Sequence, residues 1–350
     1  MKYIFGPVPS RRLGQSLGID TIPLKTCNWN CVYCQLGRTQ PLRNERKEYY
    51  PSEEILAEAR EALDAHKPGE IDWVTFVGSG EPLLHAKMGY LIRQVKRLTD
   101  LPVAVITNGS LLYLPEVRQE LIPADAVLPS LDAGSADLYR KINRPYPKLT
   151  FEQFVEGLIA FRKTYWGKLW IEVMLVRGMN DNSQALWDIA KVLSLIEPDI
   201  VHINLPDRPP AETWVQPPIE ESLLQAMAIL GHSAQVVHPA MGTFDLSNCD
   251  NLIDAIIGII TRHPMRQKEL EGALRRWAPG QVSKALKELA SSGRAQVVER
   301  YGVRFWSAKE SNYPDEAHSK RTMLYNREPK MKGGPKTEED HSNGKGCKGL

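Results

Sequence analysis

The stretch CNWNCVYC, residues 27–34, places three cysteines within eight residues. The whole chain has 350 residues and five cysteines, so most of its thiols lie in this one segment. In a reducing compartment, cysteines serve metal binding or catalysis more often than disulfides. The spacing Cys27-x3-Cys31-x2-Cys34 therefore indicates a metal centre.

Two kinds of metal centre compete for this segment. Structural zinc usually has four ligands, but no His precedes residue 66, and Cys249 and Cys347 lie far along the chain. We interpret Cys249 as a small buried residue and Cys347 as an incidental thiol. An iron–sulfur cluster normally has four thiolate ligands, so three would leave one iron open to a substrate or cofactor.

Predicted strands and helices alternate through the first two thirds of the chain, in about six units before residue 240. This order predicts an α/β fold with a parallel sheet. Ligands in such folds bind at the carboxyl ends of the strands, where polar and glycine-containing segments occur here. The predicted strands cover residues 16–22, 73–77, 103–107, 126–131, 169–176, 200–205 and 234–238.

Three further segments accompany the cysteine motif. They are Gly78-Ser79-Gly80-Glu81-Pro82 after the second predicted strand, Thr107-Asn108-Gly109 after the third, and Ser130-Leu131-Asp132 after the fourth. With Tyr33 directly before the last cysteine, the chain resembles the radical S-adenosylmethionine (SAM) superfamily over roughly residues 15–240. The first of the three segments is similar to the Gly-Gly-Glu-Pro motif of that superfamily, with Ser79 in place of a glycine.

The resemblance implies a fold, two cofactors and a reaction type. Residues 1–246 would form a (β/α)6 partial TIM-type barrel. Cys27, Cys31 and Cys34 would bind three irons of a [4Fe–4S] cluster, and SAM would chelate the fourth. Reductive cleavage of SAM would give a 5′-deoxyadenosyl radical that abstracts hydrogen from an unknown substrate, with flavodoxin or ferredoxin as the electron donor. The resemblance implies no further catalytic residue.

The resemblance also implies a set of SAM-binding residues. Glycines allow close backbone approach to a ligand. Backbone carbonyls and the Glu81 carboxylate would then bind the methionine ammonium, and Tyr33 would lie near the adenine. Polar side chains at strand ends would bind the ribose and the methionine carboxylate. The full predicted set is Tyr33, Gly78, Ser79, Gly80, Glu81, Pro82, Asn108, Ser130 and Asp132.

One branch of the superfamily is most similar. Residues 5–14, 35–37 and 204–206 resemble proteins related to the tRNA wyosine synthases. Those synthases carry a second cysteine cluster before the SAM motif. The 26 residues that precede Cys27 contain no cysteine, which argues against formation of the tricyclic wyosine base.

Basic residues outside these motifs are candidate substrate contacts. Arg11 and Arg12 could bind a phosphate or carboxylate, or could form a solvated turn. Asn204 lies at the end of the sixth predicted strand and Arg208 just after it, so both are well placed for ligand contact. We interpret His202 as a strand histidine with ordinary partners.

Residues 247–308 read as three helices and a hairpin, the order of a winged helix-turn-helix. They contain 10 Lys and Arg and 6 Asp and Glu, a net charge of +4. This predicts either docking to nucleic acid or protein, or a basic packing domain. Residues 309–350 are polar and predict a disordered tail.

Composition excludes several classes of protein. Hydrophobic residues make up 42% and charged residues 25%, and the net charge is +2. These values exclude a wholly disordered chain and a chain-wide polycation. No apolar run approaches the roughly 18 residues of a membrane helix, so we expect a cytoplasmic protein with no membrane partner.

Three functions remain open. One is a radical SAM oxidoreductase acting on RNA, another macromolecule or a small substrate. The alternative is an iron–sulfur sensor that controls a winged-helix nucleic-acid reader, and a third is an activase for a glycyl-radical enzyme. The segment Gly80-Glu81-Pro82 favours the first, because a sensor needs no SAM pocket.

Overall fold

The computed structural model describes residues 1–237, 251–275 and 278–314. Cys249, Cys347 and residues 315–350 of the predicted tail lie outside the described residues.

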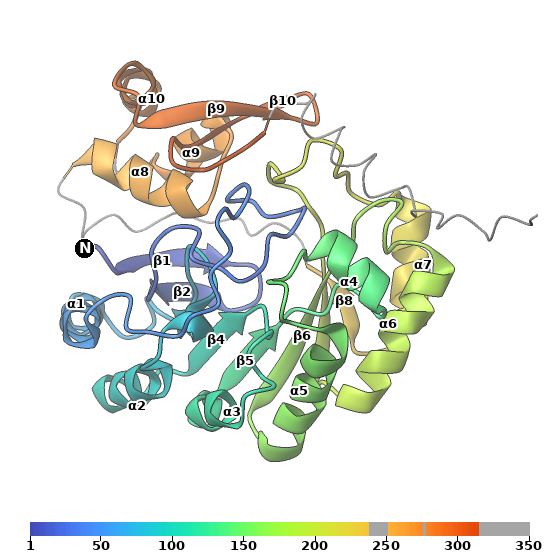
Figure 1. Cartoon of the computed structure of the whole chain (residues 1–350). Coiled ribbons are helices and arrows are strands. Elements are labelled where there is room, and N and C mark those ends of the chain that lie inside the picture. Colours follow the sequence, from blue (N-terminus) through green and yellow to red (C-terminus); the bar gives the residue numbers. More distant parts are fainter. Residues whose placement is uncertain (238–250, 276–277, 315–350) are drawn as a thin grey trace, which may run out of the picture.

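One sheet of eight strands organises the first part of the chain, and its strands neighbour one another in sequence order (Figure 1). The first two strands are antiparallel and all later neighbours are parallel. The predicted α/β fold with a mostly parallel sheet is therefore confirmed. The strands are β1 (Ile4–Ser10), β2 (Gly14–Ile19), β3 (Trp73–Phe76), β4 (Val103–Thr107), β5 (Ala126–Pro129), β6 (Lys168–Met174), β7 (Ile200–Asn204) and β8 (Ala234–Val236).

Helices connect the parallel strands, and their starts follow local sequence signals. Thr150 and Gln153 form a capping box at the start of the helix that begins at Phe151. Asn182 caps the helix that begins at Ser183, because its side chain accepts from the backbone N–H of Ala185. The elements are α1 (Ser52–Asp64), η1 (Pro82–Leu84), α2 (Met88–Leu98), α3 (Pro115–Leu121), α4 (Ala136–Ile142), α5 (Phe151–Thr164), α6 (Ser183–Ile196) and α7 (Glu220–Leu230).

The strand β1 is the main departure from the sequence expectation, which starts the sheet at residue 16. Pro7 and Pro9 argue against a strand because proline cannot donate to a ladder. Here they are tolerated because β1 is the outermost strand and pairs only with β2. The cysteine loop therefore follows the second strand of the sheet.

The strand interiors are almost completely buried. Leu17, Val74, Val105 and Ile171 have no exposed surface. Parallel strands that are covered on both faces need such apolar runs, since no face meets water. Packing of this kind fixes the carboxyl ends of the strands, and the loops that leave those ends carry the polar residues discussed below.

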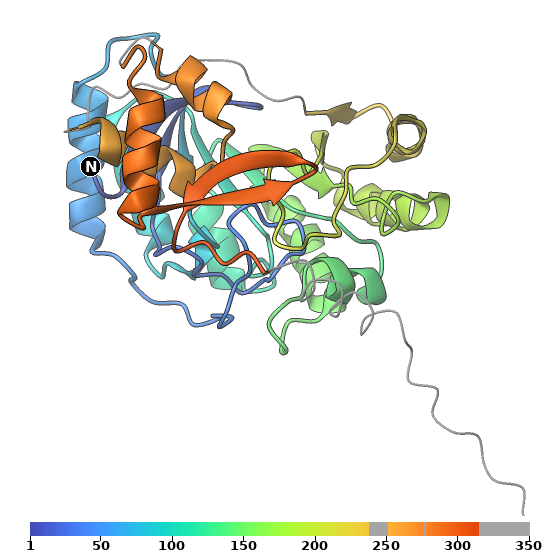
Figure 2. The ribbon, with the colours of Figure 1, turned by 90° about the horizontal axis from the view of Figure 1, so that it is seen from above.

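A second unit follows, made of α8 (Leu252–Arg262), α9 (Gln267–Ala273), α10 (Val282–Ser291) and the hairpin β9 (Ala295–Arg300) and β10 (Val303–Ala308). Ile256, Ile260, Leu270 and Leu286 are part of its own hydrophobic core. Figures 1 and 2 show it above the first strands of the sheet. The predicted element order is present, and its assignment as a winged helix stays a prediction.

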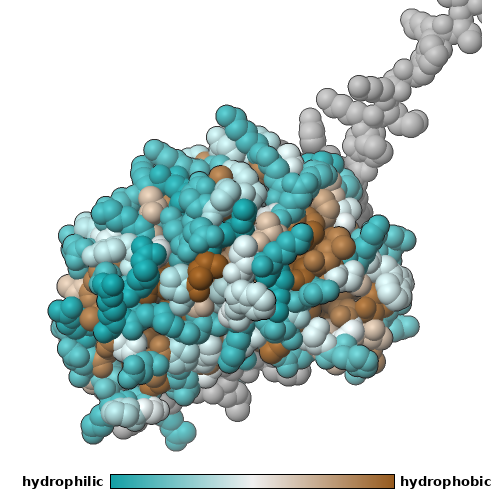
Figure 3. Space-filling view, turned by 90° about the horizontal axis from the view of Figure 1, so that it is seen from below, coloured by the Kyte–Doolittle hydropathy of each residue, from teal (hydrophilic) through white to brown (hydrophobic). Residues whose placement is uncertain are grey.

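The surface is mainly hydrophilic. Figure 3 shows the molecule from below, with hydrophobic side chains in separate patches among hydrophilic ones. Within the described residues, every helix is too short or too polar to span a bilayer.

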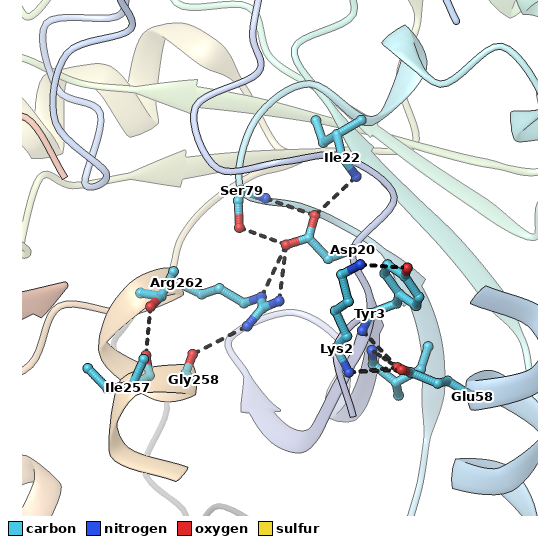
Figure 4. A network of polar contacts seen from close by, with 11 residues as sticks. Lys2, Tyr3, Asp20, Ile22, Glu58, Ser79, Ile257, Gly258 and Arg262 are labelled. Carbon is cyan, nitrogen blue, oxygen red and sulfur yellow. Dashed lines mark hydrogen bonds and ion pairs between the residues drawn. The ribbon is translucent and has the colours of Figure 1, made fainter. Parts of the chain in front are cut away.

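A buried ion pair joins the second unit to the sheet (Figure 4). Asp20, just after β2, accepts hydrogen bonds from the backbone N–H and hydroxyl of Ser79, at 3.2 and 2.7 Å. Arg262, the last residue of α8, donates its Nε to the same carboxylate at 3.2 Å. Its guanidinium also lies 4.5 Å from the centre of the Phe5 ring. The Asp20 side chain is only 5% exposed, so this pair connects α8 to the Gly78–Pro82 segment inside the protein.

Replacing Arg262 with alanine should destabilise the protein by at least about 2 kcal/mol, because it leaves the buried Asp20 carboxylate without its cation. Urea unfolding measures this change. Arg294→Ala is the matched control: its partner is the exposed Asp254, so the expected cost is below about 1 kcal/mol. Equal costs for the two variants would contradict the role assigned to the Asp20–Arg262 pair.

Candidate functional site

The three clustered cysteines lie in the loop that follows β2, and all three side chains are partly buried. Every sulfur has at least one nitrogen donor nearby. The donors are Trp29 N (3.4 Å) and Asn108 Nδ2 (3.8 Å) to Cys27, Asn143 Nδ2 (3.7 Å) to Cys31, and Lys25 Nζ (3.2 Å) to Cys34. Such donors stabilise thiolates, which are the ligating form of cysteine.

Burial works in the opposite direction. It raises the pKa of Cys27 to about 12 and holds that of Cys31 well above its ordinary value, with nearby carboxylates adding to both shifts. A negative charge on either thiol is therefore unfavourable unless a cation offsets it. A bound metal supplies that cation and deprotonates its thiol ligands.

The donor set fits an iron–sulfur cluster. Within the described parts of the chain, no three His, Cys, Asp or Glu side chains stand close enough together to hold a single metal ion. A cluster needs something different, namely one thiolate for each of several irons. Three thiols in one loop, each with its own nitrogen donor, meet that requirement.

Glu81 connects two of the loops that surround the cysteines. Its Oε1 accepts from Leu83 N at 2.9 Å and Thr107 Oγ1 at 2.6 Å, and its Oε2 accepts from Asn108 N at 2.7 Å. Burial raises the pKa of Glu81 to about 7, while these three hydrogen bonds lower it. The carboxylate therefore already fixes the end of β4 to the loop after β3. Its predicted contact with the SAM ammonium stays a prediction.

The glycines of the Gly78–Pro82 segment lie in close contact with the loop that follows β2. A Cβ on Gly80 would collide with the carbonyl oxygen of Thr26, and one on Gly78 would lie 2.5 Å from Asp20 Oδ1. Backbone hydrogen bonds from Glu81 N to Thr26 O and from Lys25 N to Ser79 O join the same segments. Close packing against the cysteine loop therefore favours glycine at these positions, and their approach to a ligand stays a prediction.

Asp132, which follows β5, connects the cysteine loop to the strands β5 and β6. Its Oδ2 accepts from Tyr33 OH at 2.5 Å and from Asn143 Nδ2 at 2.6 Å, and its Oδ1 accepts from Met174 N at 2.8 Å. Burial raises the pKa of Asp132 to about 6, against the effect of these donors. Tyr33 thus ties the cysteine loop to the end of β5.

The predicted site residues do not all come together. Asn108, Tyr33 and Asp132 surround the cysteine loop as described above. The Ser79 hydroxyl instead donates to Asp20, and Ser130 pairs its backbone with Glu172 of β6. Pro82 begins the 3-10 helix η1.

Sequence reasoning missed three residues of this site. Lys25 and Asn143 contact cysteine sulfurs, and Asn28 Oδ1 accepts from Asn108 Nδ2 at 2.8 Å. Lys25 and Asn28 flank the first cysteine, which was an available signal. Asn143 follows the last residue of α4, where asparagine is an ordinary helix-ending residue, so its sequence position carries no signal.

A second polar group lies between the β1–β2 turn and the strands β6 and β7. Arg12 Nη1 lies 2.6 Å from Glu172 Oε1 and donates to Asn204 Oδ1 at 3.4 Å. His202 is buried beside them, and burial together with Arg12 lowers its pKa to about 4. The predicted contact residues Arg12 and Asn204 are therefore neighbours.

Comparison with known proteins agrees with the site. Residues 21–191 match the Radical SAM superfamily, a range that contains the three cysteines and the segments joined to them. The UPF0026 protein of Methanocaldococcus jannaschii is 35% identical over 278 residues, which cover 78% of this chain and 86% of that protein. The chain belongs to the radical SAM superfamily. Members of this superfamily bind a [4Fe–4S] cluster and SAM, as the sequence motifs predict.

Other similar proteins are longer or more distant from this chain. A protein named GTPase Obg from Brachyspira hyodysenteriae is 38% identical, but this chain spans only 43% of its length. The SAM-dependent tRNA 4-demethylwyosine synthase of Danio rerio is 24% identical over 58% of this chain and 28% of that protein. This chain is therefore a distant relative of that synthase. Among solved structures, Streptococcus suis SuiB bound to SAM superposes with a TM-score of 0.47 at 14% identity, covering 63% of this chain and 49% of SuiB.

Gly80→Ala should lower stability by about 1–3 kcal/mol, because the added methyl overpacks the contact with Thr26. It should also lower the iron bound after anaerobic reconstitution, since Thr26 directly precedes Cys27. Urea unfolding and iron analysis measure the two effects. Gly258→Ala, in open space on α8, is the control and should keep full iron content. Full iron content in both variants would show that the glycine packing does not shape the cysteine loop.

His202→Gln should make the protein less sensitive to acid. The pKa of His202 is lowered in the folded state, so below about pH 6.5 the unfolded chain binds a proton at this histidine that the folded chain does not. The free energy of unfolding therefore decreases as the pH falls from about 6.5 toward 4. Between pH 7 and pH 5 the free energy of unfolding should therefore decrease by about 2 kcal/mol more in the wild type than in the variant. Urea unfolding at both pH values tests this, with the exposed His232→Gln as control. Parallel losses in wild type and His202→Gln would refute it.

Proposed function

We propose that this protein is a radical SAM enzyme that reductively cleaves SAM and abstracts hydrogen from its substrate. Cys27, Cys31 and Cys34 hold three irons of a [4Fe–4S] cluster in this proposal. When bound, the cluster and SAM together supply the electron transfer and the hydrogen abstraction. A reductant such as flavodoxin or ferredoxin provides the electron.

The surrounding residues prepare the site. Lys25, Asn108 and Asn143 donate toward the three sulfurs and favour their charged form. Glu81 holds the end of β4 against the loop after β3, and Asp132 holds the end of β5 against the cysteine loop. The carboxyl ends of successive strands thereby form one SAM-binding edge, in which Tyr33 and Asn108 lie next to the cluster ligands. Because these groups are fixed by hydrogen bonds, little reorganisation is needed when the cofactors bind.

One observation carries the proposal: loops after β3, β4 and β5 all make side-chain contacts with the loop that holds the cysteines. A structural zinc loop needs no such connections at three strand ends. In the proposed enzyme the sheet β2–β8 is a partial TIM-type barrel, since consecutive strands lie side by side in chain order. Residues 247–308 are the appended winged helix.

A second candidate function has its own supporting contact. Gln35, next to Cys34, donates its Nε2 to the carbonyl oxygen of Arg262 at 2.8 Å. The backbone N–H of Arg38 donates to the carbonyl of Asn312 at 2.7 Å. An iron–sulfur sensor would need this kind of direct connection between its cluster loop and a nucleic-acid-binding unit. SAM distinguishes the candidates, because only the enzyme needs it to change the electron paramagnetic resonance spectrum of the reduced cluster.

Cys31→Ala should abolish SAM cleavage, because it removes one of the three proposed iron ligands. The protein is reconstituted anaerobically with iron and sulfide, reduced with dithionite and mixed with SAM, and 5′-deoxyadenosine is quantified by chromatography. The loss should be at least about 100-fold relative to the wild type, as expected when the cofactor that carries the chemistry is lost.

Cys347→Ala controls for the removal of a thiol and should retain wild-type cleavage. Zinc in place of iron in the purified wild type, or equal cleavage by wild type and Cys31→Ala, would refute the enzyme. An unchanged resonance spectrum on addition of SAM would favour the sensor.

A further inference from the structure

Cys34 differs from the other two clustered cysteines in the kind of donor that reaches its sulfur. Lys25 Nζ lies 3.2 Å from Cys34 Sγ. The side-chain donors to Cys27 and Cys31 are the neutral amides of Asn108 and Asn143, at the longer distances of 3.8 and 3.7 Å. Hydrogen bonds from charged donors are stronger than those from neutral ones, so the contact with Lys25 is the strongest side-chain contact to the three sulfurs in the described chain.

The ammonium group of Lys25 has no counter-ion nearby. In the described parts of the chain, no carboxylate forms an ion pair with it, and its acceptors are Cys34 Sγ and the carbonyl oxygen of Gly37 at 2.7 Å. Lys25 is half-buried, and a partly desolvated cation without a negative partner is unfavourable. The thiolate form of Cys34 is the group in position to supply that negative charge.

Both ends of this contact are fixed by the surrounding structure. The φ angle of Lys25 is +62°, in the left-handed region that residues with a side chain rarely adopt, and its N–H donates to the carbonyl oxygen of Ser79 at 2.6 Å. Such a conformation persists where neighbouring contacts determine it. At the other end, Gly37 pairs its backbone with Asn312. The ammonium is therefore held beside Cys34 Sγ by contacts with two other segments.

Carboxylates act in the opposite direction on the other two cysteines. After burial, the charge of Glu81 is the next largest cause that raises the pKa of Cys27, and the charge of Asp132 has the same place for Cys31. These carboxylates disfavour further negative charge at the site, whereas the ammonium of Lys25 favours it. The reduction potential of an iron–sulfur cluster depends on net charge and on hydrogen bonds to the sulfurs. A cation that donates to a ligating sulfur should therefore raise that potential.

We propose that Lys25 is a positioning residue that holds the thiolate of Cys34 and raises the reduction potential of the cluster. One electron from the reductant, the flavodoxin or ferredoxin of the proposed function, adds one negative charge to the site. The ammonium of Lys25 stabilises that charge through Cys34 and makes the electron transfer more favourable. This inference rests on the proposed function, because it concerns the cluster that the three cysteines hold there.

A redox titration followed by electron paramagnetic resonance tests this role in the reconstituted protein without SAM. Lys25→Met removes the ammonium but keeps a long unbranched side chain, so the backbone at a φ of +62° meets the same steric demand. The potential of this variant should be lower than that of the wild type by about 59 mV or more, which corresponds to a tenfold loss in the one-electron reduction equilibrium. Lys25→Arg keeps a charged donor and should restore most of the potential.

Lys163→Met is the matched control, because it removes the same charge from an exposed position near the end of α5, and it should keep the wild-type potential. Equal potentials in Lys25→Met and Lys163→Met, or a potential as low in Lys25→Arg as in Lys25→Met, overturn the role of Lys25. If Lys25→Met binds no iron, Lys25→Gln takes its place. A potential of Lys25→Gln equal to that of Lys25→Arg then overturns the role.

Iron content and SAM cleavage are measured on the same samples. Cleavage by the wild type together with an unchanged potential in Lys25→Met refutes only the role of Lys25. A lowered potential in Lys25→Met without cleavage by the wild type supports that role and refutes only the proposed enzyme. A wild type that holds zinc in place of an iron–sulfur cluster refutes both.

Discussion

The carboxylate of Glu81 is the contact on which the rest of the site depends. Three donors from two segments meet on its two oxygens, which holds the end of β4 against the loop after β3. Asn108 is held there through its backbone, which leaves its side chain free to reach Cys27 and Asn28. Since a buried carboxylate is unfavourable unless all of its oxygens are paired, the two loops cannot separate without exposing or orphaning this charge. The position of Cys27 thus depends on a residue whose side chain forms no hydrogen bond with a cysteine.

The second unit, which begins with α8, also contacts the cysteine loop and the Gly78–Pro82 segment. Arg262 reaches Asp20 beside Ser79 with its side chain and accepts from Gln35 with its backbone, so the end of α8 contacts both the Gly78–Pro82 segment and the cysteine loop. Near the end of the described chain, Asn312 packs against Gly37, where a Cβ would collide with its backbone. A ligand or macromolecule that shifted this unit would therefore act directly on the loop that carries Cys34.

The sequence predicts the elements whose cause is local and misses those whose cause is tertiary. Cys27, Cys31, Cys34 and the Gly78–Pro82 segment could be located because their residue types and spacing are constrained by chemistry. The strand β1 could not, since Pro7 and Pro9 argue against it and only its place at the sheet edge makes it tolerable. The contact of Asn143 with Cys31 joins residues 112 positions apart, and no spacing rule could identify it. For the same reason the sequence could name Arg11 and Arg12 as basic residues, but not show that Asp207 and Glu172 are their partners.

The side-chain amide of Gln35 joins the cysteine loop to the end of α8 and to the segment after β7. Its oxygen accepts from Arg208 and its nitrogen donates to the last residue of α8, while its neighbour Cys34 has Lys25 as its donor. The cysteine loop, the end of α8 and the segment after β7 are thereby held together through a single neutral side chain. A neutral amide suits this position, because it can exchange partners on either side without leaving a buried charge unpaired.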